Sequence, residues 1–363
     1  MRAPDGNNRG PAPRKRRALV GEGQGQRKGP NPGALPTQPQ RSRGSVLLRR
    51  VIAGFVVAPP FVLGAYAGGG WVLLGVTIPT VLALREFYAL TRRPGRRLME
   101  PLGFLLAFGI LLANGGRELL LGDANDLARP AILAGMPGGG LLEALLTPDR
   151  FAYFARFSVA AAVIVPLIAL LFERADMRGR LVGWAVTLAG TLYVAWLMSH
   201  FQTMRLLGGE TDAGRGWIFY TFAATWSFDT GAYLVGSRIG RTPFMSHISP
   251  SKTWEGTAGG FVFCLIATLI ACVALPAGTP LLVDPLGWSP LSVALWQAPL
   301  LALGMSAAAS FGDLAESMIK REAGAKDAGE LIPGHGGMLD RVDSLLFTVV
   351  LAYYYAVWFG GLG

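Results

Sequence analysis

The sequence predicts an all-α polytopic integral membrane protein with about nine transmembrane helices, a cytoplasmic N-terminus and a disordered basic N-terminal tail. Three observations predict this class. Hydrophobic residues make up 52% of the 363 residues, only 15% are charged, and mean hydropathy is +0.41; soluble domains average about 25% charged residues. Apolar runs of about 20 residues, the length that crosses a bilayer as a helix, recur along the chain. Basic residues near the ends of these runs fall on one side when the runs alternate in direction.

The candidate spans follow one another from the end of the basic tail to the C-terminus. They lie at 51–66, 71–90, 101–114, 156–173, 182–204, 216–235, 257–275, 291–312 and 343–360. Segment 115–155 stays unassigned, because its apolar stretches are short and interrupted, as in a re-entrant or interfacial helix. Since basic residues near span ends stay cytoplasmic, the connectors 236–256 and 313–342 face the cytoplasm. Loop 276–290 has no Lys or Arg and falls outside. We therefore expect a multi-pass protein of the cell (inner or plasma) membrane.

Charge and composition divide the chain into three parts. Residues 1–50 hold twelve Lys or Arg and two acids, whereas the rest holds twenty-one of each sign. The tail, 1–44, is rich in Pro, Gly, Gln and Arg and is expected to be disordered. We expect it to be attracted to anionic lipid rather than to nucleic acid. Transmembrane helices would fill 45–215, and the catalytic region would be 216–363.

Two polar segments depart from the apolar background in the first half of that region. "TWSFDTGAYLVGSRIGR" (225–241) places Asp229 inside an otherwise uncharged predicted span. A carboxylate there costs about 2.5–3.5 kcal/mol on insertion scales, so it is expected to face an interior cavity; a polar contact between helices is the alternative. "HISPSKTWEGTAGG" (247–260) precedes a helix expected near Gly256, whose N-terminus could bind an anion. It is not a P-loop, and a solvated loop is the alternative. Its candidate side chains are Ser249, Lys252, Thr253 and Glu255.

The third polar segment, 310–344, combines carboxylates, cations and a glycine-rich turn. On a helix, Asp313, Ser317 and Lys320 project from one face, with Glu316 nearby. The chain then breaks at "IPGHGG", where glycines allow a tight turn and close approach to a ligand. A second helix expected near Asp340 would carry the remaining acids. A salt-bridged connector is the alternative, but it does not account for the turn.

This third segment has the composition of a metal–phosphate site. Carboxylate oxygens with open positions suit Mg²⁺ that is bridged to phosphate oxygens. The carboxylates are those of Asp313, Asp340 and Asp343. Phosphate-pairing cations would come from Lys320, Arg321, Lys326 and Arg341.

The same segment resembles a known family signature. "SMIKREAGAKDAGELIPGHGGMLDRVD" (317–343) is similar to that of the phosphatidate cytidylyltransferase (CDP-diglyceride synthase) family. "SPSKTWEG" (249–256) resembles the family's Ser-Pro-x-Lys-Thr-x-Glu-Gly element, and "DTGAYLVG" (229–236) its intramembrane Asp segment. The resemblance is firm over 225–345. The tail has no counterpart, and Ala328 stands where a small hydroxyl residue is frequent. The positions in register are Ser317, Lys320, Arg321, Lys326, Asp327, His335, Gly336, Gly337, Asp340, Arg341 and Asp343.

The resemblance implies an enzyme that condenses CTP with phosphatidic acid, giving CDP-diacylglycerol and pyrophosphate. It also implies Mg²⁺, in some members with a monovalent cation such as K⁺, and a homodimer in the lipid bilayer. Asp313, Asp340 and Asp343 would hold the metal. His335 would contact a phosphate or donate to the leaving group, or else stabilise the turn; Asp229 would support the metal ligands or bind a second cation. The expected catalytic residues are Lys320, Arg321, Lys326, Asp327, His335 and Asp229. Expected substrate contacts are Ser249, Lys252, Thr253, Glu255, Ser317, Gly336, Gly337 and Arg341.

Three rival functions fit parts of the sequence. A CTP-dependent polyprenol or phytol kinase would transfer the γ-phosphate to an alcohol. A CDP-alcohol phosphotransferase would need a D-G-x-x-A-R…G-x-x-x-D-x-x-x-D pattern, which the sequence lacks. A transporter could hold an intramembrane Asp, but it would not need the carboxylate and cation cluster.

Overall fold

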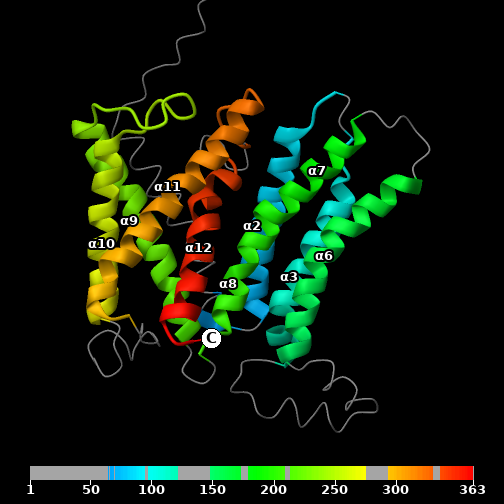
Figure 1. Ribbon diagram of the computed structural model, residues 1–363, viewed down its shortest axis with the longest axis horizontal. Coiled ribbons are helices and arrows are strands. Elements are labelled where there is room, and N and C mark those ends of the chain that lie inside the picture. The colour runs from blue at the N-terminus through cyan, green and yellow to red at the C-terminus, as the bar shows by residue number, and fades with distance from the viewer. Residues whose placement is uncertain are drawn as a thin grey trace, which may run out of the picture. The chain divides into compact units, whose positions relative to one another are not determined.

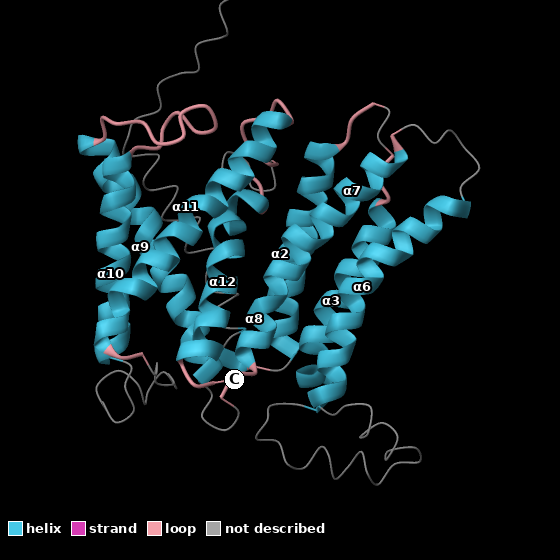
Figure 2. Cartoon of the chain, in the orientation of Figure 1, coloured by secondary structure: helices cyan, strands magenta, loops and turns pink. Residues whose placement is uncertain are grey.

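The computed structural model describes most of the chain beyond the tail as an assembly of helices (Figures 1 and 2). All described residues belong to one compact unit, Leu47–Gly363. Within them no strand forms, and Pro243 and Thr253 pair in an isolated bridge, as the predicted all-α class requires. The predicted tail, nearly all of the span 51–66, the loop 276–290 and His335 lie outside the described residues. The described residues are 64, 66–68, 70–94, 97–121, 148–172, 179–208, 213–274, 293–329 and 336–362.

The helices follow the predicted order of apolar runs. In chain order they are α2 (Gly70–Thr91), α3 (Glu100–Leu121), α6 (Pro148–Phe172), α7 (Arg180–Gly190), the π-helix η1 (Thr191–Trp196), α8 (Leu197–Arg205), α9 (Ala213–Ile239), α10 (Trp254–Ala274), the 3₁₀ turn η3 (Leu295–Gln297), α11 (Ala298–Glu322) and α12 (Leu339–Phe359). The helices α7, η1 and α8 run on without a break, so they form one long helix.

Length and composition make five of these helices candidate membrane spans. They are Gly70–Thr91, Arg180–Arg205, Trp254–Val273, Leu295–Glu322 and Leu339–Phe359. The apolar parts of α3 and α6, Glu100–Gly116 and Arg156–Phe172, are shorter. The helix α9 has 27 residues but is less apolar. The protein is therefore membrane-embedded, and the expected total of nine crossings stays a prediction.

The last helix, α12, packs against helices from both ends of the sequence. It contacts α2, α8, α9 and α11, and Figure 1 shows it between the α9–α11 group and the α2–α8 group. Side chains that recur at helical spacing along it are fully buried. They are Val342, Leu346, Val349, Ala352 and Ala356. Residues at the beginning of α12 are thereby fixed relative to α2 as well as to α11.

A glycine lets α11 and α12 approach closely where their polar residues begin. Gly312 is buried, and a Cβ added to it would lie 2.5 Å from the backbone oxygen of Asp343 and 3.1 Å from Cα of Ser344. Only a residue without a side chain fits between two backbones at that separation. The close contact brings Asp313, the next residue along α11, up to the first turns of α12.

We expect Gly312→Ala to lower the thermal stability of the protein in detergent. The added methyl group would force α11 and α12 apart, and such overpacking costs about 1–3 kcal/mol. The measurement is the unfolding temperature, followed by intrinsic fluorescence. Gly109→Ala is the matched control, because a Cβ at this α3 position meets nothing within 4 Å and alanine is the better helix former. If the two variants unfold at the same temperature, the close contact does not constrain the helices.

Candidate active site

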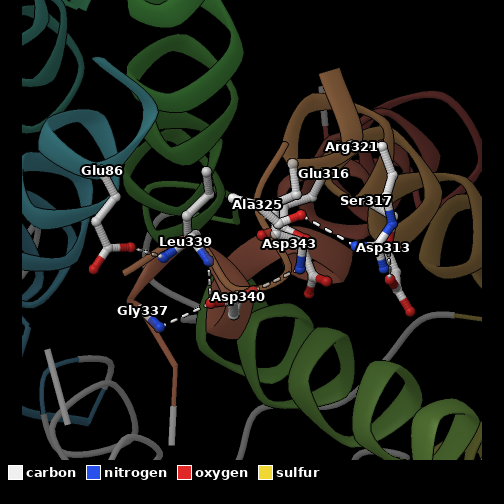
Figure 3. A network of polar contacts seen from close by, with 12 residues as sticks. Glu86, Asp313, Glu316, Ser317, Arg321, Ala325, Gly337, Leu339, Asp340 and Asp343 are labelled. Carbon is white, nitrogen blue, oxygen red and sulfur yellow. Dashed lines mark hydrogen bonds and ion pairs between the residues drawn. The ribbon is translucent and has the colours of Figure 1, made fainter. Parts of the chain in front are cut away.

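Three carboxylates converge where α11 meets the beginning of α12. Asp313 and Glu316 come from α11 and Asp343 from α12, and one oxygen of each lies within 4.8 Å of the others (Figure 3). Glu316 is fully buried, whereas the two aspartates are partly exposed. Asp229 of α9 is exposed rather than enclosed in an interior cavity as predicted, and its charge acts on Asp343. An all-oxygen, strongly negative donor set of this kind fits a hard divalent cation such as Mg²⁺.

Local contacts orient two of these carboxylates. The hydroxyl of Ser317, one turn along α11, donates to Oδ1 of Asp313 at 3.3 Å. The backbone N–H of Ser344 donates to Oδ1 of Asp343 at 2.6 Å. Asp343 therefore keeps Oδ2 without this bond, whereas Oδ2 of Asp313 faces the ammonium of Lys252. The sequence-predicted pair Asp313 and Asp343 thus comes together, and Glu316, which sequence reasoning placed only nearby, joins them.

Lys320 lies inside the site as a counter-charge. Its side chain is only 11% exposed. Its ammonium forms an ion pair with Glu316 and another with Oδ1 of Asp340 at 2.6 Å. A buried carboxylate without such a partner would be costly, so the contact with Lys320 offsets part of the cost of burying Glu316.

Asp340 is not part of the carboxylate cluster, although the sequence predicts it as a metal ligand. Its Oδ1 accepts from Lys320, and its Oδ2 accepts from the backbone N–H groups of Ala328 at 2.9 Å and Gly337 at 2.8 Å. Gly336 adopts φ +80°, and a Cβ there would lie 2.9 Å from Oδ2 of Asp340. Both carboxylate oxygens are therefore engaged in holding the two ends of the segment between α11 and α12. Gly336 and Gly337 shape that turn.

Glu86 of α2 caps the beginning of α12, and sequence reasoning did not select it. Its carboxylate accepts from the backbone N–H groups of Met338 at 2.9 Å and Leu339 at 2.8 Å (Figure 3). A helix N-terminus leaves such N–H groups without partners, and a negative charge stabilises it. A Cβ on Gly337 would lie 2.3 Å from Oε2 of Glu86, so a side chain at this position would displace the Glu86 carboxylate. The available signal was an acid within the predicted span 71–90, but Arg85 precedes it, whereas Asp229 lies in an otherwise uncharged span.

The loop that precedes α10 reaches the cluster through one lysine. The ammonium of Lys252 lies 2.8 Å from Oδ2 of Asp313 and donates to the carbonyl of Ser310 at 3.3 Å. With 20% of its side chain exposed, Lys252 lies at the rim of the cluster. Lys252 and Asp313, two predicted site residues about sixty positions apart in the chain, are thus in contact.

Two other predicted contacts of this loop stabilise its own backbone. Thr253 Oγ1 accepts from the N–H of Gly256 at 3.2 Å, which is the N-cap contact of α10. The carboxylate of Glu255 accepts from the N–H groups of Arg241 and Thr242 at 3.1 Å and from the Thr242 hydroxyl at 2.8 Å. Both residues therefore shape the connector between α9 and α10.

The third predicted contact of this loop, Ser249, is half-buried, and its backbone N–H donates to the carbonyl of Met245.

The remaining predicted residues lie around the cluster. Arg321 joins two loops, because its guanidinium donates to the carbonyls of Ile248 at 3.3 Å and Ala325 at 3.1 Å. Lys326 and Asp327 are exposed, and the described residues show no contact between them and the carboxylates. Arg341 is half-buried beside Asp340 in the first turn of α12.

Comparison with known proteins agrees with this site. The profile described as "Cytidylyltransferase family" matches residues 48–359. The chain is 32% identical over 343 residues to phosphatidate cytidylyltransferase 5, chloroplastic, of Arabidopsis thaliana, which covers 88% of this chain and 74% of the relative. It is 34% identical over 229 residues to phosphatidate cytidylyltransferase of Bacillus subtilis (61% and 78%) and 37% identical over 179 residues to that of Brucella suis (49% and 58%). The chain therefore belongs to the cytidylyltransferase family.

Proposed function

We propose that this protein transfers the CMP group of CTP to phosphatidic acid, forming CDP-diacylglycerol and pyrophosphate for phospholipid synthesis. The observation that carries the proposal is the cluster of Asp313, Glu316 and Asp343 with Lys252 at its rim. The cluster lies in the segment that resembles the family signature. Relatives named phosphatidate cytidylyltransferase align with up to 88% of the chain.

The reaction needs little acid–base chemistry from the protein. A phosphate oxygen of phosphatidate forms a bond to the α-phosphorus of CTP. The bond from that phosphorus to the bridging oxygen breaks, and pyrophosphate leaves with the electron pair. Because the attacking oxygen is already anionic, the protein contributes mainly by positioning both phosphates and neutralising their charge.

Asp313, Glu316 and Asp343 would hold Mg²⁺, with Glu316 in the role predicted for Asp340. When bound, the ion would neutralise phosphate oxygens and orient them. Asp229 adds negative charge beside Asp343, which supports its proposed role near these ligands or with a monovalent cation such as K⁺.

The cations around the cluster would bind the phosphates. Lys252 is partly exposed beside Asp313, so its ammonium can turn toward a phosphate oxygen once a metal occupies the carboxylates. Arg321 is exposed between two loops, and Lys326 is exposed as well. Lys320 pairs with Glu316 and holds Asp340 in place, which makes it a positioning residue in this proposal.

We further propose that the site faces the cytoplasm of a cell membrane that the chain crosses nine times from a cytoplasmic N-terminus. The excess of Lys and Arg beside the relevant span ends supports this orientation, and it gives the site access to CTP. The homodimer is supported by the family resemblance and remains a prediction.

The test uses purified protein in detergent with phosphatidic acid, Mg²⁺ and CTP labelled separately at the α and γ phosphates. Cytidylyl transfer puts the α label into lipid and the γ label into pyrophosphate. A polyprenol or phytol kinase would put the γ label into its lipid alcohol, so that assay is run with the alcohol added. Binding of substrate without turnover would favour a transporter and contradict the proposal.

A further inference from the structure

The long helix that begins with α7 changes its winding next to the candidate active site. The six residues Thr191–Trp196 form the π-helix η1. Such segments are rare and often occur at functional sites, because the wider turn redirects the side chains that it carries. Tyr193 is in the middle of this turn and carries a hydrogen-bonding group.

The ring of Tyr193 is held by the two helices that meet at the turn before α12. It lies 6.1 Å from the ring of Phe87 and packs edge-on against Phe347, with centroids 6.4 Å apart. Phe87 follows Glu86 on α2, and Phe347 lies one helical turn beyond Asp343 on α12. The ring position is therefore fixed relative to the carboxylate cluster.

The hydroxyl of Tyr193 is buried, and no described residue forms a hydrogen bond with it. Other buried tyrosines differ: the Tyr88 hydroxyl donates to the carbonyl of Thr187 at 3.1 Å, and the Tyr220 hydroxyl pairs with Thr268 at 3.0 Å. An unpaired buried hydroxyl lowers stability. A ligand with an acceptor oxygen could supply the hydrogen-bond partner that the Tyr193 hydroxyl lacks.

The surroundings indicate which ligand this is. The Tyr193 ring packs on Phe347, one turn beyond Asp343 on α12, and the charges of the three cluster carboxylates act on its hydroxyl. None of the three accepts its hydrogen bond. A phosphate bound at the cluster would bring new acceptor oxygens toward the hydroxyl.

We infer that the Tyr193 hydroxyl donates a hydrogen bond to a phosphate oxygen of substrate bound at the Asp313–Glu316–Asp343 cluster. This inference rests on the proposed function and adds to it a substrate-binding residue from the N-terminal helices. CTP and phosphatidate both present such an oxygen, and the experiment separates the two.

Tyr193→Phe tests the contact, because it keeps the ring between its neighbours and removes only the hydroxyl. Without substrate, the variant should unfold at the wild-type temperature or above it. Its kcat/KM should fall about 10- to 100-fold, the effect of losing a hydrogen bond to a charged group. The rise in unfolding temperature on adding CTP with Mg²⁺, or phosphatidic acid, should shrink for whichever substrate the hydroxyl contacts.

Tyr220→Phe is the matched control, since it removes a buried hydroxyl that has a partner. It should lower the unfolding temperature and leave kcat/KM unchanged. Wild-type kinetics and wild-type substrate-induced stabilisation in Tyr193→Phe would overturn the inference, as would lower stability without a kinetic effect. Wild-type protein is assayed in parallel. If wild type does not move the α label into lipid, the proposed function is contradicted. If wild type is active and Tyr193→Phe is equally active, only the hydroxyl contact is overturned.

Discussion

Asp343→Asn is expected to reduce transfer of the α label into lipid by about 10³-fold, the size of effect seen when a group that stabilises transition-state charge is removed. Asn has nearly the same shape as Asp, so the packing of α12 should be preserved. Because the substitution removes one of three mutually repelling carboxylates, the metal-free protein should be at least as stable as wild type. The measurements are the initial rate and the rise in unfolding temperature on adding Mg²⁺, and both should decrease.

Glu322→Gln is the matched control for Asp343→Asn. Glu322 ends α11 outside the cluster, is 69% exposed and lies 3.1 Å from a guanidinium nitrogen of Arg93. Such a surface pair contributes little, so the rate and the Mg²⁺ response should match wild type. Wild-type values of both quantities in Asp343→Asn would exclude Asp343 as a metal ligand.

Lys320→Met is expected to lower the free energy of unfolding by about 3–5 kcal/mol, the cost of removing one partner from a buried ion pair. The substitution would leave the fully buried Glu316 beside Asp340 with no ammonium between them. The measurement is chemical unfolding in detergent with a chelator present, so that metal binding does not mask the effect.

Two further variants isolate the cause of that loss. Adding Glu316→Gln to Lys320→Met should restore much of the stability, because the buried charge is neutralised, while cytidylyl transfer stays low. Arg92→Met breaks the ion pair with Glu100 (2.7 Å), in which Arg92 is 66% exposed, and should cost no more than about 1 kcal/mol. Equal losses in Arg92→Met and Lys320→Met would contradict the account given for Lys320.

The helices could be predicted from the sequence because apolar runs of sufficient length have few alternatives in a membrane. Their ends could not. The run expected at 101–114 continues as helix to Leu121, and that expected at 156–173 begins at Pro148. Hydropathy falls at the first polar residues, whereas backbone hydrogen bonding continues through Arg and Glu, which are good helix formers.

The candidate site, too, could be predicted from the sequence only in part. Spacing along α11 and the glycine-rich turn placed Asp313 and Asp343 in one region. Asp340 and Asp343 both face α11, but Asp340 pairs with Lys320 whereas Asp343 joins the carboxylate cluster. Which acid joins the cluster depends on where α12 lies along α11, and the spacing within α12 does not specify that. The cap from Glu86 joins residues 252 and 253 positions apart. Contacts of that kind follow from packing and leave no local pattern in the sequence.

The Glu86 cap also makes completion of the candidate site depend on α12, the last helix of the chain. Because α2 precedes α12 in the chain, α2 is synthesised first. The Glu86 carboxylate therefore lacks the N–H groups of Met338 and Leu339 until translation is nearly complete. A chain interrupted after α11 would already contain Asp313 and Glu316, but it would lack Asp343 and the N–H groups that Glu86 accepts. The candidate site would then be complete only in full-length chains, and truncated products would be expected to lack cytidylyl transfer.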